Sequence, residues 1–486
     1  MKQIFNPYLP LNEYVPDGEP HIFGDRVYVY GSHDKENGDH FCMLDYVTYS
    51  TPVDDLKSWR YEGVIYKAEK DPLYPEYKYM FAPDVVCGND GRYYLYYSLS
   101  NDYPNCSYVM SVAVCDTPSG EFEFLGHVKH SDGSLLTDGV IFDPAVLNDN
   151  GTIRLYYGMW WNFERDFEGE ESLRRQVSTF KKTKEEILGA SDGVMGPFCV
   201  TLCDDMITVK DEPVRIFPRD FRGTSLEGHE FFEASSMRKI GDKYYFVYAT
   251  FNGHELAYAT SDYPNKDFVF GGVIVSNGDI GYNGRTESEQ IMRTGNIHGS
   301  IIEINGEWYV FYHRHTAKTE LSRQACAEKI EIAPDGSIAQ VEITSCGLNG
   351  APLIASGSYS AIICCALTNY KLHYGPCQDE RLPHILARDN ERFLCEIENG
   401  CLFGYKYFDF DNCSKVGIKY RSGDTLPSGV INVMLEEHGE SIARIEISDF
   451  SSWQEALADI SVKGTHALYF KYEGVGAIDI LEILFK

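Results

Sequence analysis

The sequence predicts an all-β protein, with a five-bladed β-propeller followed by a C-terminal, jelly-roll-like β-sandwich. The first observation is a pattern that occurs five times, in which a Gly-containing turn precedes an aromatic and β-branched run: GDRVYVYGS, DGRYYLYYS, NGTIRLYYG, GDKYYFVYA and NGEWYVFYH. Such a turn and run are typical of a β-hairpin. The second is the spacing of the turn glycines, which are 67, 60, 90 and 65 residues apart and suit blades of four short strands: Gly24, Gly91, Gly151, Gly241 and Gly306.

The third observation is a change of composition near residue 346. The segment CGLNGAPLIASG (346–357) supplies Gly, Pro and Ser, and it is followed by short alternating runs such as VINVMLEEHG, SIARIEIS, HALYFKYEG and AIDILEILFK. Alternating runs of this length, separated by turn signals, are typical of the strands of a β-sandwich. We therefore place the propeller at residues 1–345 and the sandwich at residues 350–486.

One polar residue precedes each of the five turns at nearly the same distance. Seven or eight residues before the turn glycines stand Asp17, Asp84, Asp143, Glu233 and His298. The innermost strand of a propeller blade lines the central channel, so we expect these five side chains to gather around the axis. Recurrent hairpins also occur in other large β proteins, but they give no reason for the shared offset.

A ring of carboxyl groups around one axis is competent for glycoside hydrolysis. That reaction needs one protonated carboxyl at the leaving-group oxygen and one ionised carboxylate on the opposite side. A third acid nearby can raise the pKa of the proton donor by like-charge repulsion. The spacing alone makes this chemistry plausible and leaves other roles open.

Composition excludes several classes of partner. The net charge is −30, from 43 Lys and Arg against 73 Asp and Glu, so neither a nucleic acid nor an anionic membrane is expected as a partner. No apolar run approaches the length of a membrane span. The amino terminus MKQIFNPYLPLNEY lacks an apolar signal region, and the 14 Cys show no zinc-ligand spacing. These features favour a cytoplasmic protein with free thiols.

The contexts of the five polar residues resemble glycoside hydrolase family 43. The matching segments are VPDGEPHIF around Asp17, FAPD at Asp84, FDPAVL around Asp143, EASSMRK from Glu233 and GNIHGS around His298. The resemblance covers about the first 345 residues, in the family's order. It implies a five-bladed propeller that acts on arabinose- and xylose-containing glycans with inversion of configuration, without an organic cofactor.

The resemblance also implies a role for each residue. Asp17 would be the general base, Glu233 the general acid, and Asp143 the acid that tunes and orients Glu233. Asp84 would help to shape the substrate subsite. His298 would hold a water or a metal ion at the axis. The carboxylate-rich surroundings of His298 favour Ca²⁺, and another cation stays open.

Several positions depart from the family's pattern. Gly18 replaces the Pro that usually follows the base, and Glu19 is a rival for that role. Phe81 replaces the usual Trp on a surface that stacks on substrate. Ala234 and Ser235 replace the Gly-Pro that usually follows the acid. These changes indicate an atypical branch, so substrate identity does not transfer directly.

Three further side chains are candidates for substrate contact. Trp160 and Trp161 follow the third repeat and offer aromatic faces to a sugar ring, although packing against the adjacent insertion explains them equally well. Arg314, in YHRHT, either contacts substrate or pairs with a central carboxylate.

The C-terminal part resembles family 6 carbohydrate-binding modules through FGYKYFDFDN (403–412), Trp453 and the strands near the end of the chain. Ala477 stands where such modules often carry a ligand-binding Asn. The part is therefore either a glycan-binding module or a buttress for the propeller.

Together these features predict an intracellular, inverting exo-glycosidase for arabino- or xylo-oligosaccharides, either an α-L-arabinofuranosidase or a β-xylosidase. Two alternatives stay open. One is a catalytically silent glycan-binding propeller, which should have lost a central carboxylate. The other is a retaining enzyme of the invertase type, whose WMNDPNG-like start and ECP-like acid segment are absent from this chain.

Overall fold

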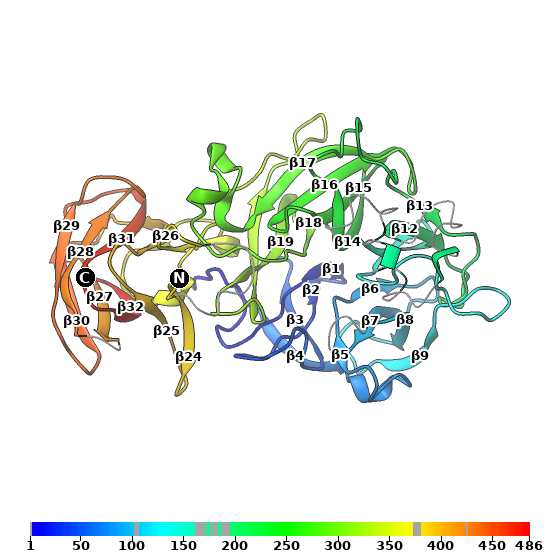
Figure 1. The fold of residues 1–486 in the computed structure, drawn as a ribbon, viewed down its shortest axis with the longest axis horizontal. Coiled ribbons are helices and arrows are strands. Elements are labelled where there is room, and N and C mark those ends of the chain that lie inside the picture. Colours follow the sequence, from blue (N-terminus) through cyan, green and yellow to red (C-terminus); the bar gives the residue numbers. More distant parts are fainter. Residues whose placement is uncertain are drawn as a thin grey trace.

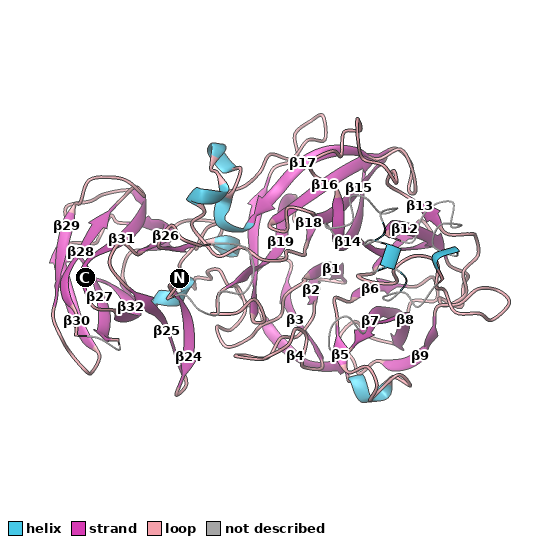
Figure 2. Cartoon of the chain, viewed as in Figure 1, coloured by secondary structure: helices cyan, strands magenta, loops and turns pink. Residues whose placement is uncertain are grey.

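The structure is a computed structural model that describes residues 2–101, 106–160, 195–372, 381–423 and 426–486, together with 170, 173–174, 177 and 183–185 (Figure 1). Strands make up most of its regular structure (Figure 2). None of the helices within these ranges has the length and apolar character that crossing a membrane requires. The short 3₁₀ turns of the described chain include η1 (Ala68–Lys70), η3 (Asn277–Asp279), η4 (Tyr282–Gly284), η5 (Glu287–Glu289), η6 (Gly347–Asn349) and η7 (Ala361–Ile363).

Each predicted repeat forms one antiparallel sheet. The first contains β1 (Glu19–Phe23), β2 (Arg26–Tyr30), β3 (Tyr46–Pro52) and β4 (Arg60–Tyr66). The second contains β5 (Tyr79–Met80), β6 (Asp84–Cys87), β7 (Tyr93–Ser100), β8 (Cys106–Cys115) and β9 (Glu123–His127). The third contains β10 (Ala145–Asp149), β11 (Thr152–Met159), β12 (Gly196–Thr201) and β13 (Val214–Arg215).

The fourth sheet contains β14 (Phe231–Ile240), β15 (Lys243–Thr250), β16 (Glu255–Ser261) and β17 (Val269–Ser276), and the fifth contains β18 (Ser300–Ile304), β19 (Glu307–His315) and β20 (Arg323–Ile330). The inner strands contact one another in the order β1, β6, β10, β14, β18 and back to β1. This closed ring confirms the five-bladed propeller.

The repeated turn and run explain how each blade forms. In the third blade Asp149 pairs with Thr152 across Asn150 and Gly151, and both turn residues have positive φ, as a two-residue hairpin turn requires. The aromatic runs that follow pack blade against blade. In one buried cluster, Tyr30 of the first blade lies with Tyr97 of the second.

The amino-terminal segment runs beside the outer strand of the fifth blade. The backbone N–H of Tyr8 donates to the carbonyl of Ala325 at 3.2 Å. The Asn6 side chain accepts from the N–H of Ala327 and donates to its carbonyl, at 3.1 and 3.0 Å. The two ends of the propeller chain are thereby joined within one blade.

The C-terminal part is built from two six-stranded sheets. One contains β21 (Leu353–Ile354), β23 (Ala366–Thr368), β26 (Leu402–Asp409), β28 (Ser428–Met434), β29 (Ala443–Ile447) and β31 (Thr465–Val475). The other contains β22 (Gly357–Ser360), β24 (His384–Arg388), β25 (Glu391–Ile397), β27 (Lys415–Ser422), β30 (Gln454–Asp459) and β32 (Ile478–Phe485). Phe408 of the first sheet and Phe485 of the second pack with ring centroids 4.7 Å apart.

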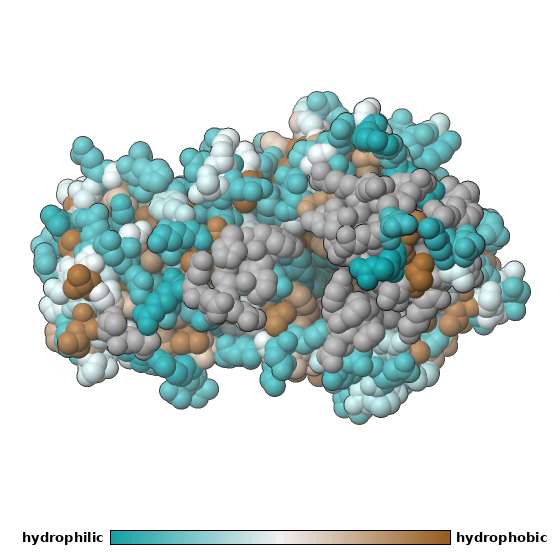
Figure 3. All heavy atoms as spheres, viewed as in Figure 1, coloured by the Kyte–Doolittle hydropathy of each residue, from teal (hydrophilic) through white to brown (hydrophobic). Residues whose placement is uncertain are grey.

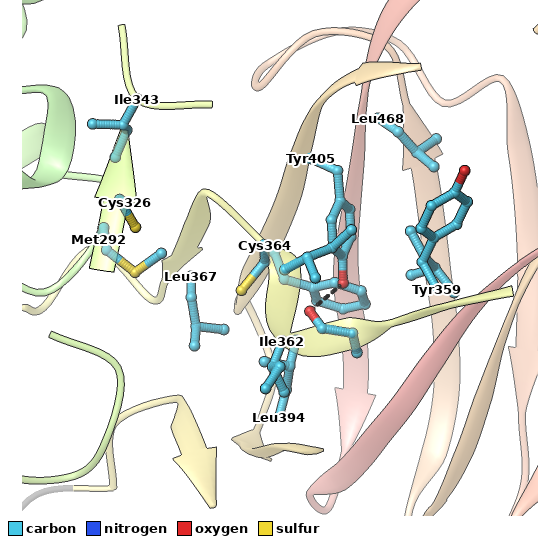
Figure 4. Close-up of a cluster of buried hydrophobic side chains, with 14 of the residues drawn as sticks. Met292, Cys326, Ile343, Tyr359, Ile362, Cys364, Leu367, Leu394, Tyr405 and Leu468 are labelled. Carbon is cyan, nitrogen blue, oxygen red and sulfur yellow. Dashed lines mark hydrogen bonds between the residues drawn. The ribbon is translucent and has the colours of Figure 1, made fainter. Parts of the chain in front are cut away.

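The apolar core of this second part continues into the propeller. A single buried cluster joins Leu394, Tyr405 and Leu468 to Met292 and Cys326 of the propeller (Figure 4). The hydroxyl of Tyr405 is satisfied by the Ala361 carbonyl at 2.8 Å. The change of composition near residue 346 therefore marks no break in the packing.

Hydrophilic residues cover most of the described outer surface that Figure 3 shows.

Candidate active site

Residues of the propeller line a cavity of about 450 Å³. Its lining residues all fall between 17 and 323: Asp17, Asp39, His40, Phe41, Phe81, Ser100, Asn101, Phe142, Asp143, Met159, Phe232, Glu233, Asn296, His298, Glu320, Leu321 and Arg323. Five of the sequence-predicted site residues are among them: Asp17, Phe81, Asp143, Glu233 and His298.

The hairpin geometry explains why four of these polar residues meet. Asp17, Asp143 and His298 each stand six residues before the last paired residue of their inner strand. Glu233 stands seven residues before it, and register shifts on both sides of Glu233 absorb the additional residue. These similar distances from the turns explain why the four side chains meet in one cavity.

The second blade differs because its turn is longer. Cys87 pairs with Tyr93, so five residues separate the two strands. The residue six positions before Cys87 is Phe81, which takes the cavity position, whereas Asp84 stands only three positions before it. Phe81 packs against Phe142 with ring centroids 5.2 Å apart, and the two rings form part of the cavity wall.

Asp84 does not line the cavity, so the geometry does not support its expected subsite role. Its Oδ1 accepts from His21 Nε2 at 2.6 Å and from the N–H of Val85 at 2.7 Å, and its Oδ2 accepts from the N–H of Val146 at 2.7 Å. The carboxylate is fully buried. It therefore joins the inner strands of the first three blades.

The cavity acids are held by unusual backbone. Asp17 and Asp143 have φ of 58° and 43°, and Ala234, directly after Glu233, has φ of 66°. Asp enters this left-handed region more readily than most residues, whereas Ala pays about 1–2 kcal/mol there. Strain of this kind gathers at functional sites. A Gly at position 234 would adopt the same φ without this cost.

Asp17 is surrounded by groups that favour its ionised form. Ser32 Oγ donates to its Oδ2 at 2.6 Å, and Arg323 Nη1 donates to its Oδ1 at 2.9 Å. Burial works to raise the pKa of Asp17, but the Arg323 guanidinium and the His313 imidazole outweigh it and hold the pKa below its usual range. Asp17 is therefore a carboxylate at neutral pH.

Arg323 is a cavity residue that the sequence analysis missed. It is 2% exposed and also pairs with Asp34, whose Oδ2 accepts from Arg323 Nε at 2.8 Å. It lies 306 residues from Asp17 along the chain. The only sequence signal is the need of buried carboxylates for a cation, and that need does not say which Arg supplies it.

Glu233 is held in the opposite protonation state. Burial, followed by the negative charge of Asp17, raises its pKa to about 8, although Arg323 opposes the shift. Burial and the Glu233 and Asp17 carboxyls also raise the pKa of Asp143. The like charges near Glu233 are therefore Asp17 and Asp143, since the repulsion between Glu233 and Asp143 acts in both directions. Asp143 Oδ2 also accepts from the N–H of Ala234 at 3.0 Å and fixes the backbone beside Glu233.

His298 lies between the cavity acids and Glu19. Its Nδ1 is 3.7 Å from Asp143 Oδ2, and its Nε2 is 4.0 Å from Glu19 Oε1. Burial lowers its pKa to about 4, so the imidazole is neutral at neutral pH. Neither Nε2 nor the Glu19 oxygen has a hydrogen-bond partner within the described part of the chain.

Glu19, the rival base, does not line the cavity. It is fully buried, and its Oε2 accepts from Arg238 Nη2 at 2.7 Å and from Ser236 Oγ at 3.2 Å. Glu19, His21 and Asp84 form a second group of titratable side chains with ligand atoms within 4.8 Å of one another.

Trp160 and Arg314 do not reach the cavity. Trp160 is 3% exposed, packs on Phe221 with ring centroids 5.2 Å apart and lies under the Arg215 guanidinium. Arg314 is buried and donates to the carbonyls of Ile362 and Cys364, at the start of the C-terminal part. Packing therefore accounts for both side chains. Trp161 lies outside the described residues.

Most of the other cavity residues that the sequence analysis missed fall into two groups. Phe41, Phe142 and Phe232 add aromatic faces of the kind that pack against sugar rings. Asp39, His40, Asn296 and Glu320 add polar groups that can bind hydroxyls. Phe232 lies in β14 next to Glu233, and the other six come from loops between strands. A cavity of acids, neutral donors and aromatic faces can bind a carbohydrate and exchange protons with it.

Comparison with known proteins agrees with this chemistry. A xylosidase/arabinosidase of Thermoclostridium stercorarium is 45% identical over 498 residues, which cover 99% of this chain and 98% of that protein. A family 43 enzyme of Xanthomonas citri complexed with xylotriose is similar in structure, with a TM-score of 0.53 and 25% identity over 72% of this chain and 96% of that one.

A family 43 beta-xylosidase/alpha-arabinofuranosidase from a compost microbial metagenome, in a calcium-free complex with xylotriose, has a TM-score of 0.51 and 26% identity over 68% of this chain and 96% of that one. The profile of the family described as Glycosyl hydrolases family 43 matches residues 24–338. The propeller, the cavity acids and these similarities lead to one conclusion: the chain belongs to family 43 of the glycosyl hydrolases.

Proposed function

We propose that this protein is an inverting exo-glycosidase that releases arabinose or xylose from oligosaccharides, as an α-L-arabinofuranosidase, a β-xylosidase or both. The observation that carries the proposal is the opposite state of two carboxyls in one cavity: the pKa of Asp17 is held low and that of Glu233 is raised to about 8. A pair of carboxyls separated in this way is the requirement for acid and base catalysis at one pH. The names of the similar proteins support the choice of sugars.

In this mechanism Asp17 acts as the general base. Its carboxylate accepts a proton from a water, and that water attacks the anomeric carbon of the terminal sugar. Glu233, which is protonated, donates its proton to the glycosidic oxygen as the bond to the leaving group breaks. Asp143 positions Glu233 through the N–H of Ala234. One displacement by water gives a product of inverted configuration.

The cavity also suits a terminal sugar. Its volume of about 450 Å³ lies within the usual range for small-molecule sites. Aromatic rings from several blades, Phe81, Phe142 and Phe232, offer apolar faces, while the acids lie at the ends of the inner strands. Such a site holds one sugar in a fixed orientation against both carboxyls.

The test has two parts. A panel of nitrophenyl arabinofuranosides, xylosides and galactosides would give the preferred sugar from kcat/KM. Proton NMR of the first product formed from a xylo-oligosaccharide would give its anomeric configuration. We expect activity on the first two classes and an inverted product. A retained configuration would instead make Asp17 the nucleophile of a two-step reaction.

We also propose that a hydrated cation, with Ca²⁺ the first candidate, binds between His298 and Glu19. The neutral Nε2 of His298 and the Glu19 Oε1, both without a hydrogen-bond partner in the described chain, fit such an ion. When bound, the cation would supply positive charge beside the buried carboxyl of Glu19. Removal by a chelator should lower the melting temperature. An unchanged melting temperature after verified metal removal would leave a bridging water as the explanation.

The remaining proposals concern location and organisation. We propose a cytoplasmic protein, because the cysteines in the described part of the chain are free thiols and most of them are buried. We also propose that residues 1–345 carry the catalytic site and residues 350–486 buttress it. The continuous core between the two parts supports a buttress over a tethered binding module.

A further inference from the structure

One side of the cavity is formed by two loops. The first joins β2 to β3 and contributes Asp39, His40 and Phe41. The second precedes and enters β20 and contributes Glu320, Leu321 and Arg323. We call residues 33–42 and 316–323 the cavity wall.

The two loops of the cavity wall are bonded to each other. Ser322 Oγ donates to the carbonyl of Lys35 at 3.1 Å, and Arg323 pairs with Asp34. The Arg323 guanidinium also lies over the ring of Phe41, 4.8 Å from its centroid. A displacement of one loop is therefore passed to the other.

The hairpin β24–β25 of the C-terminal part contacts both loops. Arg392 Nε and Nη2 donate to the two oxygens of Glu36 at 2.7 and 2.9 Å. Asn37 Nδ2 donates to the carbonyl of Ala387 at 3.3 Å, next to the turn of the hairpin. The N–H of Ile385 donates to the carbonyl of Thr316 at 2.8 Å. In Figure 1 this hairpin lies at the boundary between the two parts of the molecule.

The Arg392–Glu36 contact is the strongest of these. A bidentate pair of guanidinium and carboxylate fixes both distance and orientation. The two side chains are only 20% and 26% exposed, and Tyr14 donates a further bond to Glu36 at 3.0 Å. Glu36 is three residues before Asp39, so the position of Glu36 constrains the segment that enters the cavity at Asp39.

We infer that the hairpin β24–β25 sets the position of the cavity wall and that Arg392 is a positioning residue for substrate binding, acting through Glu36. The C-terminal part thereby takes part in substrate binding, although none of its described residues lines the cavity. The expected change in KM rests on the proposed function. The expected change in the conformational order of residues 33–42 does not.

The chain offers a matched control in a second Arg–Glu fork between the two parts. Arg285 Nη1 and Nη2 donate to the two oxygens of Glu437 at 3.2 and 2.7 Å, and the side chains are 20% and 11% exposed. None of the cavity-lining residues lies between 277 and 295. Loss of this fork therefore controls for the general effect of losing a contact between the two parts.

The experiment compares Arg392→Met with Arg285→Met in the full chain. Hydrogen–deuterium exchange of residues 33–42 and 316–323 would be measured first, together with kcat and KM on the best substrate of the nitrophenyl panel. For Arg392→Met we expect amide exchange in the cavity wall to rise and KM to increase about 3- to 10-fold, with a smaller change in kcat. For Arg285→Met we expect neither change.

Glu36→Gln provides a second route to the same contact, including for the case that Arg392→Met does not fold. It should reproduce the rise in exchange and KM, and the double variant should add little to either single change. Arg392→Lys, which keeps the charge, should raise amide exchange and KM less than Arg392→Met does. Equal effects of Arg392→Met and Arg285→Met, or unchanged exchange in both, would overturn the inference. If the wild-type protein hydrolysed none of the panel, the proposed function would fail while the exchange result still decided this inference.

Discussion

Two groups of ionisable side chains lie near the inner strands of the propeller, and they differ in their access to the cavity and in their partners. Asp17, Asp143 and Glu233, the cavity acids, line an open space and share one nearby cation, Arg323. Glu19, His21 and Asp84, which we call the sealed cluster, do not line this cavity. The carboxyl oxygens of the cluster accept from Arg238, Ser236, His21 and backbone N–H groups. Acidic residues on inner strands are therefore no guide to catalysis by themselves.

The difference teaches which feature makes a carboxyl chemically active. Both groups are buried, and burial raises the pKa of Glu19 as it does that of Glu233. Only the cavity acids combine a carboxyl whose pKa is lowered with one whose pKa is raised, at a place that substrate can reach. In the sealed cluster, the carboxylate of Asp84 is occupied by three donors and serves to hold neighbouring strands together.

The largest expected effect is the loss of the base. Asp17→Asn should lower kcat/KM by about 10²–10⁴-fold, because no carboxylate remains to accept a proton from the attacking water. The loss should be similar for natural and activated substrates. Glu19→Gln, the matched change in the sealed cluster, should keep most of the activity. Near-full activity of Asp17→Asn together with an inactive Glu19→Gln would exchange the two assignments.

The second effect concerns pH. Glu233 must be protonated to act as the acid, and its raised pKa of about 8 means that the active form is lost as pH rises through that value. Above it, kcat/KM should fall about tenfold for each further pH unit. The measurement is the pH profile of kcat/KM. A basic limb in the ordinary carboxyl range, near about 4 to 5, would contradict a protonated Glu233 at neutral pH.

The smallest effect on catalysis is expected in the sealed cluster. Asp84→Asn replaces an acceptor with an amide that cannot satisfy His21 and the N–H groups of Val85 and Val146 together. The free energy of unfolding should fall by about 1.5–3 kcal/mol, as for the loss of a hydrogen bond to a charged group. Denaturant unfolding would measure the loss. A drop in kcat as large as that of Asp17→Asn, with stability unchanged, would place Asp84 in the chemistry.

Much of the fold was predictable because its signals are local. Turn residues and aromatic runs lie next to each other in the chain, and they are repeated in each of the five blades. The positions of Asp17, Asp143, Glu233 and His298 followed from the same signal, since each stands at a nearly fixed distance from a turn. Asp84 was misplaced because the count assumed a short turn, and the second blade has a longer one.

The parts that were not predictable depend on contacts between distant segments. Arg323 meets Asp17 across most of the chain, and no periodicity links them. Arg314 turns toward Ile362 because the C-terminal part packs there, so its direction is set by the interface. Trp160 fits a pocket made by Phe221 and Arg215, which the sequence separates from it by the long insertion.

The most direct test of the division between acid and base is a leaving-group series measured on Glu233→Gln. Aryl glycosides with increasingly acidic phenols need less protonation, so kcat/KM of the variant should approach that of the wild type as the phenol becomes more acidic. Asp17→Asn, measured in parallel, should stay slow across the whole series. If Glu233→Gln lost the same factor with every leaving group, Glu233 would not be the proton donor, and the central claim would be contradicted.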